Sequence, residues 1–270
     1  VVTVHDVGFY RYPKLYKPIQ NIYHRWSTKD ILKRADTVIT VSEYSRQELI
    51  HFCDADPDKV HVTHLGLNQQ QYKQMPPEKA ALALARFHLA SPFFLYIGRL
   101  EAKKNILLLI EAFHRYKTDH GLGDPYRLVL AGVPGAQYDQ IAEKIARSPV
   151  RDQIYLTGYV NETEKIALLS TATALIHPAW YEGFGFTPLE AMCASCPVLC
   201  SRVGSLPEVV GVDNAVWFDP SNAEDLTNKM TKIVQDEELR KMLRERGREW
   251  VYRYTWQKTA AETLKLLTTV

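Results

Sequence analysis

The sequence predicts an α/β fold in which parallel strands form a doubly wound sheet with helices on both faces. Between residues 92 and 235, short apolar runs of strand length alternate with segments of helical pattern, and the loops between them are short. Repeated strand–helix units of this kind connect parallel strands. Two of the strands lead through a glycine-bearing loop into a helix, one at Gly98 and one at residues 183–185. A strand end followed by a helix start is the usual anion site of an α/β sheet.

The composition excludes several classes of protein. The chain has 270 residues, of which 46% are hydrophobic and 24% charged, so it is globular and long enough for one large or two smaller domains. Its net charge of +2 comes from mixed signs, so nucleic acid is not an expected partner. No apolar run approaches the ~18 residues of a membrane-spanning helix, and no signal peptide is visible. Because the chain opens on Val1 without a methionine, we expect it to be the interior of a longer protein.

The first 75 residues are expected to form one domain. Apolar runs and helical patterns predict strands at 1–6, 36–41 and 59–63, and helices at 19–35 and 43–52. Ser42 is the expected N-cap of the second helix. The first strand ends in His5 and Asp6, at the sheet edge where α/β folds place their chemistry.

Seven cationic side chains gather near the first of these helices: Arg11, Lys14, Lys17, Arg25, Lys29, Lys33 and Arg34. One interpretation is a solvated helix face, which we favour. The alternative is attraction toward an anionic, lipid-linked acceptor or a membrane surface.

Neither the cysteines nor the paired aspartates predict a metal site. Cys193 and Cys196 form a CxxC, but no second pair lies at zinc-site spacing, and a thioredoxin-like motif is the other alternative. We expect small buried thiols in a reducing, cytosolic compartment. Asp54 and Asp56 lie in a proline-containing turn, where aspartate is an ordinary residue.

Composition shifts after residue 66, where glutamine and proline runs precede a short alanine-rich helix. We therefore expect a linker at residues 76–91 and a second domain at residues 92–252. The second domain should hold a parallel sheet of about six strands, with the strand at 93–97 beside the strand that ends at residue 176. The remaining residues, 253–270, are expected to form a last helix.

The most informative stretch is residues 180–192, between a buried strand and the next helix. Thr187 and Pro188 are the expected N-cap and first residue of that helix. Two carboxylates, Glu182 and Glu190, flank the glycine loop with seven residues between them. Taken alone, Thr187-x-x-Glu190 also matches a capping box, in which Glu190 would bind only the helix start.

A second glycine corner carries positive charge. Residues 98–105 follow a strand and precede a helix, and they include Gly98, Arg99 and Lys104. Cations in a loop that opens a helix favour the binding of an anion. The alternative for either cation alone is a basic surface loop, and Lys103 is the expected solvated neighbour.

The glutamate pair within EGFGFTPLEAM, together with GRLxxxKN, resembles the signature of family 4 of the retaining glycosyltransferases. This resemblance implies the GT-B fold, with two Rossmann-like domains, of which the N-terminal one is incomplete here. It implies that the last helix crosses back to the N-terminal domain from the aromatic segment at Tyr254 and Trp256.

The resemblance also implies a role for each site residue. Arg99 and Lys104 would bind the nucleotide diphosphate beside Gly98, and Glu190 would bind the ribose hydroxyls. Glu182 would face the sugar, and His5 would approach that sugar from the other domain. The remaining expected contacts are backbone groups: Gly183, Phe184 and Gly185 at the sugar, and Tyr159 and Val160 at the nucleobase edge.

The activity that the resemblance implies is sugar transfer from a nucleotide sugar to a glycan or lipid-linked acceptor. Mannose from GDP-mannose is the expected donor, with UDP-sugars left open, and no cofactor or catalytic metal is expected. The expected location is the cytoplasm, with the cytoplasmic face of a membrane as a further alternative. Two other functions stay open: a protein that binds sugar nucleotides without transfer, and an epimerase on the same fold.

Overall fold

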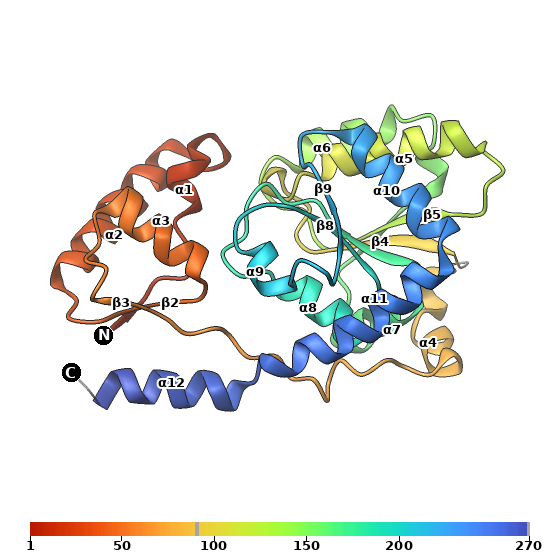
Figure 1. Ribbon diagram of the computed structural model, residues 1–270. Coiled ribbons are helices and arrows are strands. Elements are labelled where there is room, and N and C mark those ends of the chain that lie inside the picture. Colours follow the sequence, from red (N-terminus) through yellow and green to blue (C-terminus); the bar gives the residue numbers. More distant parts are fainter. Residues whose placement is uncertain (90–91, 269–270) are drawn as a thin grey trace.

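The computed structural model describes residues 1–89 and 92–268, which form two α/β units, each built on a parallel sheet (Figure 1). The first unit holds three strands in the order β1-β2-β3. Its strands are short, with two or three paired residues in each. The elements of this unit are β1 (Val2–Thr3), α1 (Gly8–Arg11), η1 (Pro13–Leu15), α2 (Pro18–Arg34), β2 (Val38–Thr40), α3 (Glu43–Cys53) and β3 (Val60–Val62).

The second unit holds a six-stranded parallel sheet in the order β6-β5-β4-β7-β8-β9. Its strands are β4 (Phe93–Ile97), β5 (Arg127–Ala131), β6 (Ile154–Gly158), β7 (Ala174–His177), β8 (Val198–Ser201) and β9 (Val216–Phe218). The predicted six-stranded parallel sheet is confirmed, and β4 lies beside β7 as expected, with Phe94 paired to Ala174. The carboxyl ends of β4 and β7 therefore meet at the centre of the sheet, where ligands bind in this class of fold.

Helices cover both faces of this sheet. The helical elements are α4 (Pro77–Ala83), η2 (Ala85–Phe87), η3 (Ala102–Lys104), α5 (Ile106–His120), α6 (Tyr138–Ala146), η4 (Arg151–Gln153), α7 (Glu162–Thr171), α8 (Phe186–Cys193), α9 (Leu206–Val210), α10 (Ala223–Gln235), α11 (Glu237–Trp250), η5 (Val251–Arg253) and α12 (Trp256–Thr268). None of the helices described combines the length and the apolar character needed to cross a bilayer.

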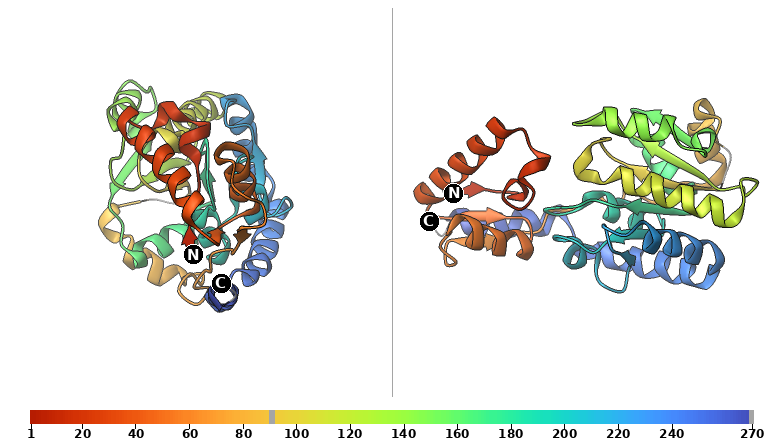
Figure 2. Two further views of the ribbon diagram at one scale, coloured as in Figure 1. Left: turned by 90° about the vertical axis from the view of Figure 1, so that its left-hand side faces the viewer. Right: turned by 90° about the horizontal axis from the view of Figure 1, so that it is seen from above.

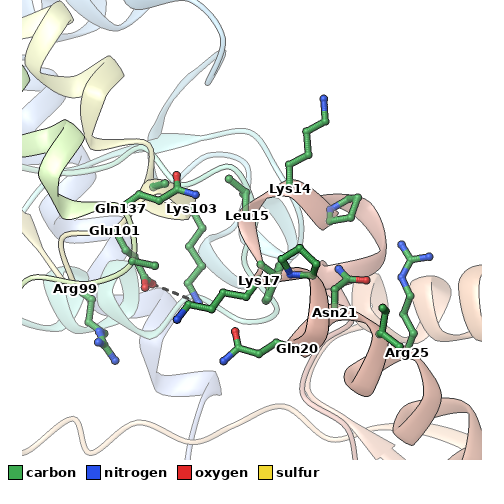
Figure 3. A pocket seen from close by; sticks show the side chains of 16 residues that line it. Lys14, Leu15, Lys17, Gln20, Asn21, Arg25, Arg99, Glu101, Lys103 and Gln137 are labelled. Atoms are coloured by element: carbon green, nitrogen blue, oxygen red, sulfur yellow. Dashed lines mark ion pairs between the residues drawn. The ribbon is translucent and has the colours of Figure 1, made fainter.

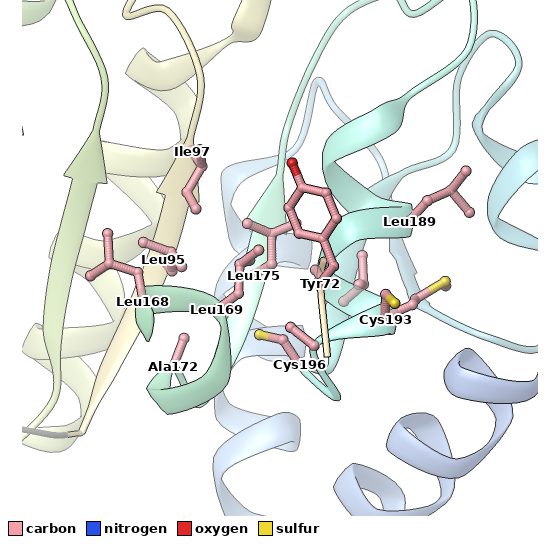
Figure 4. Close-up of a cluster of buried hydrophobic side chains, with 14 of the residues drawn as sticks. Tyr72, Leu95, Ile97, Leu168, Leu169, Ala172, Leu175, Leu189, Cys193 and Cys196 are labelled. Atoms are coloured by element: carbon pink, nitrogen blue, oxygen red, sulfur yellow. The ribbon is translucent and has the colours of Figure 1, made fainter. Parts of the chain in front are cut away.

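The alternation of side chains along β4 divides the core of the second unit into two layers. Leu95 and Ile97 pack with α7 and α8 on one face (Figure 4). Phe94 and Tyr96 point the other way, toward α5 and α10. Successive residues of a strand face opposite sides, so a strand buried on both faces is apolar throughout, as β4 is.

The segment expected to be a linker carries a packed helix. Ala80 on α4 is fully buried, and α4 lies against α7 as part of the core of the second unit. Residues 90 and 91 of this segment lie outside the described part of the chain. The chain crosses between the units earlier, where the Leu67 amide donates to the carbonyl oxygen of Tyr254 at 3.1 Å.

The last helix, α12, lies beside the first unit (Figures 1 and 2). In two views, α12 leaves the second unit and runs alongside β2 and β3 (Figures 1 and 2). The Thr259 hydroxyl donates to the carbonyl oxygen of His64 at 2.7 Å, and a Cβ on Gly66 would lie only 2.3 Å from the Trp256 nitrogen. The chain therefore passes between the two units twice, first after β3 and again just before α12.

Candidate active site

The loop between β7 and α8 is fixed by the segment that follows β8. Ser205 is fully buried, and its hydroxyl oxygen lies 3.0 Å from the carbonyl oxygens of both Glu182 and Phe184. Gly204 has a φ of +56°, and a Cβ there would lie 2.5 Å from the Glu182 carbonyl oxygen. A side chain at that position would displace the loop, so glycine is required for the close approach.

Glu182 is the centre of a buried cluster of charge. Its Oε1 atom accepts hydrogen bonds from the Lys104 ammonium and from Nε2 of His177, the latter at 2.9 Å. Burial alone would raise the pKa of this carboxyl, but His177 and Lys104 outweigh it and lower the pKa to about 2. Glu182 is therefore ionised at neutral pH. Its second oxygen, Oε2, has no hydrogen-bond partner among the described residues, which leaves it available to a ligand hydroxyl.

The sequence analysis missed His177. It is the last residue of β7 and is 3% exposed, and its Nδ1 atom is buried without a partner among the described residues. The signal was present in the sequence, because a histidine that ends an otherwise apolar strand lies where an α/β sheet places its chemistry.

His5 and Asp6 approach the glycine loop from the first unit. A cavity of about 280 Å³ lies between the units; its lining includes His5 and Asp6 on one side and Lys104, His177 and Glu182 on the other. A Cβ on Gly183 would lie 2.6 Å from Cβ of Asp6, so the two units are in contact there. The predicted residues His5, Lys104, Glu182, Gly183, Phe184 and Gly185 all line this cavity.

Arg99 lies at the end of β4 but does not line the same cavity. Its side chain is exposed, forms no ion pair within the described part of the chain, and borders a larger, separate cleft (Figure 3). The Tyr96 hydroxyl donates to the Arg99 carbonyl oxygen at 2.8 Å, which fixes the backbone that follows Gly98. Lys103 is paired with Glu101 at 3.4 Å and is partly exposed rather than fully solvated.

The predicted start of α8 is wrong. The N-cap is Gly185, with a φ of +98°, so Thr187 and Pro188 lie inside the first turn. The capping box that was the alternative interpretation of Thr187 and Glu190 is therefore absent. Glu190 pairs instead with the Lys165 ammonium on α7 at 2.7 Å, and only 10% of its side chain is exposed.

The two residues expected at the nucleobase edge lie after β6. Tyr159 is 72% exposed, and its carbonyl oxygen accepts a hydrogen bond from Arg86 at 3.1 Å. Val160 packs on the apolar core. Neither residue lines the cavity that contains Glu182.

Further contacts hold the two units together beside the site. The Ser42 hydroxyl caps α3, as predicted, and also donates to the Gly183 carbonyl oxygen at 2.8 Å. Glu208 on α9 accepts from the amides of Glu43 and Tyr44 and contacts Nε2 of His64 at 2.7 Å. The sequence analysis did not anticipate Glu208 or His64, since their partners are more than a hundred residues away in the chain.

Comparisons with known proteins identify the family. Residues 85–250 match the family described as glycosyl transferases group 1, and residues 1–71 match Glycosyltransferase Family 4. The O-antigen chain mannosyltransferase B of Escherichia coli is 30% identical over 98% of this chain and 68% of its own length. The alpha-maltose-1-phosphate synthase of Mycolicibacterium smegmatis is 30% identical over 89% of this chain and 65% of its own length.

Solved structures share the fold. The sucrose-phosphate synthase of Thermosynechococcus elongatus superposes with a TM-score of 0.83 at 24% identity, over 99% of this chain and 67% of its own. Anabaena HepE, in complex with UDP-glucose, superposes with a TM-score of 0.85 at 17% identity, over 100% of this chain and 72% of its own. The predicted GT-B fold is therefore confirmed.

The chain is shorter than its relatives. It spans about two thirds of the mannosyltransferase B and of the maltose-1-phosphate synthase, and 28% of the serotype-specific mannosyltransferase WbdA of Escherichia coli. The group 1 match nonetheless covers the whole six-stranded sheet and both glycine corners. The chain belongs to the group 1 glycosyltransferases, with a first part of the family 4 type.

Proposed function

We propose that this chain transfers mannose from a nucleotide sugar to a glycan or lipid-linked acceptor, with retention of the anomeric configuration. The observation that carries the proposal is the Glu182 cluster. An ionised carboxylate with one free oxygen lies beside Lys104 and faces His5 across a cavity between the two units. This arrangement presents an acceptor for sugar hydroxyls and a cation for a leaving group in one place.

In this proposal the two cations at the end of β4 bind the diphosphate of the donor. Negative charge grows on the diphosphate as the glycosidic bond breaks, and fixed positive charge stabilises it. Lys104 is paired with Glu182, so its ammonium is already positioned in the cavity. Arg99 has no competing partner among the described residues. Because fixed cations supply this charge, we propose that transfer needs no metal or cofactor.

The nucleoside would lie along the neighbouring loops. Glu190 would accept hydrogen bonds from the ribose hydroxyls, while Lys165 holds its Oε1 atom and Tyr72 lies beside its carboxylate. The backbone of Tyr159 and Val160 would meet the base. Phe184, with the amides of Gly183 and Gly185, would border the sugar.

The acceptor would enter from the first unit and attack on the face from which the diphosphate leaves, with the diphosphate taking the acceptor's proton. The family resemblance supports this one-face reaction, and His5 would contact the sugar from the acceptor side. The names of the Escherichia coli relatives support mannose, whereas HepE was solved with UDP-glucose. Both GDP- and UDP-linked donors therefore belong in the first test. The proposed location is the cytoplasm or the cytoplasmic face of a membrane.

A donor screen tests the proposal. Calorimetric titration of GDP-mannose, UDP-glucose and the free nucleotides should show binding of one sugar nucleotide. Incubation of that donor with an acceptor mixture should then give a glycosylated product that keeps the donor's anomeric configuration.

Two results would reject transfer. An isomerised sugar formed from donor alone would indicate an epimerase. Binding of the donor without formation of product would indicate a protein that only binds sugar nucleotides, provided that Glu182→Gln binds the donor as tightly as the unmodified chain does. Glu111→Gln is the matched control, because Glu111 also pairs with a lysine at 2.7 Å but lies far from the cavity, on α5.

A further inference from the structure

A second and larger hollow lies between the two units, apart from the cavity that contains Glu182, which we call the donor cavity. It has a volume of about 1250 Å³ and is bounded by η1 and α2 on one side and by the loop after β4 on the other. Lys17 reaches into it from the first unit and Lys103 from the second, while Arg99 lies at its margin (Figure 3). We call this hollow the cationic cleft.

The cleft is dominated by positive charge. Five cationic side chains line it, and Glu101 is the one carboxylate among the lining residues of the described chain. The cations are Lys14, Lys17, Arg25, Arg99 and Lys103. Like charges that face one another across a concave surface raise its potential and attract anions. The cleft therefore differs from an ordinary surface, where the two signs are interspersed.

Most of these cations lack a side-chain partner within the described part of the chain. Glu101 forms an ion pair with Lys103 at 3.4 Å. Lys14, Lys17 and Arg99 form no hydrogen bond or ion pair through their side chains with any described residue. Arg25 lies over the ring of Tyr10 at 4.6 Å, and its Nε atom is buried without a partner among the described residues. A solvated helix face would place its lysines outward on one element, whereas these cations come from both units and border one hollow.

Tyr16 connects the cleft to the donor cavity. It lines the cleft, and its hydroxyl lies 3.1 Å from the position of a Cβ on Gly8, two residues after Asp6. Burial and the nearby carboxylates of Asp6, Glu101 and Glu182 raise the pKa of Tyr16 to about 12. Because Asp6 and Glu182 line the donor cavity, a ligand in the cleft would extend past Tyr16 toward the reacting sugar.

We propose that the cationic cleft binds the acceptor substrate through a phosphate or diphosphate group that the acceptor carries. The inference rests on the proposed transferase function and adds the chemical class of the acceptor. Lysine ammonium groups and the arginine fork bind phosphate oxygens through charge-assisted hydrogen bonds. The phosphate would be held at Lys17 and Lys103, and the hydroxyl that attacks would point toward Glu182. With Arg99 assigned to the donor diphosphate and Lys103 paired with Glu101, a neutral glycan would still leave Lys14 and Lys17 unpaired in the cleft.

The test uses a chain whose donor site is already filled. The protein is saturated with the nucleoside diphosphate that binds best, and mannose 6-phosphate or mannose is then titrated by calorimetry. Lys17→Gln and Lys17→Glu remove and reverse the central charge, and both should fold because Lys17 is exposed. Lys33→Gln and Lys33→Glu are matched controls near the other end of α2, outside the cleft. Vesicles of phosphatidylglycerol and of phosphatidylcholine form a separate arm.

We expect mannose 6-phosphate to bind at least about tenfold more tightly than mannose, since about 1.4 kcal/mol is a factor of ten and a hydrogen bond to a charged group contributes at least that. Lys17→Gln should remove most of this difference and Lys17→Glu all of it, while both Lys33 variants keep it.

Several outcomes would overturn the inference and leave the transferase proposal standing. One is equal binding of mannose and mannose 6-phosphate to the nucleotide-loaded chain. Another is unchanged binding of mannose 6-phosphate by Lys17→Glu. A third is Lys17-dependent binding to phosphatidylglycerol vesicles without binding of mannose 6-phosphate, which would assign the cations to a membrane surface. Failure to bind any nucleoside diphosphate would instead reject the proposed function, and this inference with it.

Discussion

Glu182 and Glu190 belong to one short motif, but the structure gives them different surroundings. Glu182 precedes α8, is held by Lys104 and His177, and faces the first unit across a cavity. Glu190 lies within α8, pairs with Lys165 on α7, and does not border that cavity. Each carboxylate is bound by a lysine through its Oε1 atom, but Oε2 of Glu182 has no partner in the described chain, whereas the carboxylate of Glu190 also lies beside Tyr72.

From this comparison we propose that the motif serves two subsites rather than one. The chain passes from the loop into α8 between the two glutamates. Their side chains therefore have different surroundings although the residues are close in sequence. In this proposal Glu182 would bind a group between the units, and Glu190 a group bound to the second unit alone. The predictions below separate these roles.

The largest effect is expected for Lys104→Ala. It removes a cation from the proposed diphosphate position and leaves the Glu182 carboxylate with His177 as its one remaining partner among the described residues. We expect transfer to fall by about 10²–10³-fold, the usual cost of losing one fixed group that stabilises developing charge. Binding of a nucleoside diphosphate should weaken far more than binding of the nucleoside. Lys144→Ala, which also loses a lysine–glutamate pair, is the control. Similar losses in both variants would show that the cost is structural.

Glu190→Gln should have a smaller and more selective effect. The carboxylate would accept hydrogen bonds from the ribose hydroxyls, whereas the amide of the glutamine variant would present an N–H donor to one of them. We expect nucleoside diphosphate binding to weaken by ~1–3 kcal/mol, the range for a hydrogen bond to a charged group. The melting temperature should change no more than in Glu111→Gln, which also loses a charge paired at 2.7 Å. Unchanged binding of the diphosphate would remove Glu190 from the nucleotide site.

The pH dependence of stability should differ between Glu182 and its amide variant. The pKa of Glu182 is lowered from 4.5 to about 2 in the folded chain. Its contribution is therefore fully present above about pH 5 and is lost as the pH falls through about 2. The difference in unfolding free energy between the unmodified chain and Glu182→Gln should shrink from about pH 5 to about pH 3, as measured by urea unfolding. A constant difference over that interval would contradict the assigned pairing.

The smallest effect is expected for the cysteines. All four are buried, none forms a disulfide with another described residue, and no group of three or more His, Cys, Asp or Glu residues in the described chain could hold a metal. We predict that the purified protein carries no stoichiometric zinc and that a chelator leaves its melting temperature unchanged. Elemental analysis that finds one zinc per chain would contradict this.

The sequence predicted what depends on local pattern. The strand at 93–97 was identified by an apolar run bounded by a glycine corner, and its neighbour followed from the topology of doubly wound sheets. Ser42 was predicted as an N-cap because serine before a helical pattern has one common role. The site residues that line the cavity were found through a family resemblance, since no local rule brings His5 to Glu182.

The errors and omissions have a common cause, which is contact between distant parts of the chain. Thr187 was assigned as a cap by local rules, but the loop is fixed by Ser205 and Gly204, so α8 begins at Phe186 instead. Glu208 lies in an unremarkable short helix, and its role appears only when α3 is brought against it. Such partners cannot be read from a pattern of propensities.

The central claim is that Glu182 contacts the transferred sugar and not the nucleotide. Titration of nucleoside diphosphate and sugar nucleotide into the unmodified chain and into Glu182→Gln tests it most directly, with Glu111→Gln as the control. The account predicts that Glu182→Gln keeps the affinity for the nucleoside diphosphate and loses the additional affinity that the sugar contributes, together with transfer. Equal weakening of both ligands would contradict the claim, as would a sugar nucleotide that Glu182→Gln binds and turns over as the unmodified chain does.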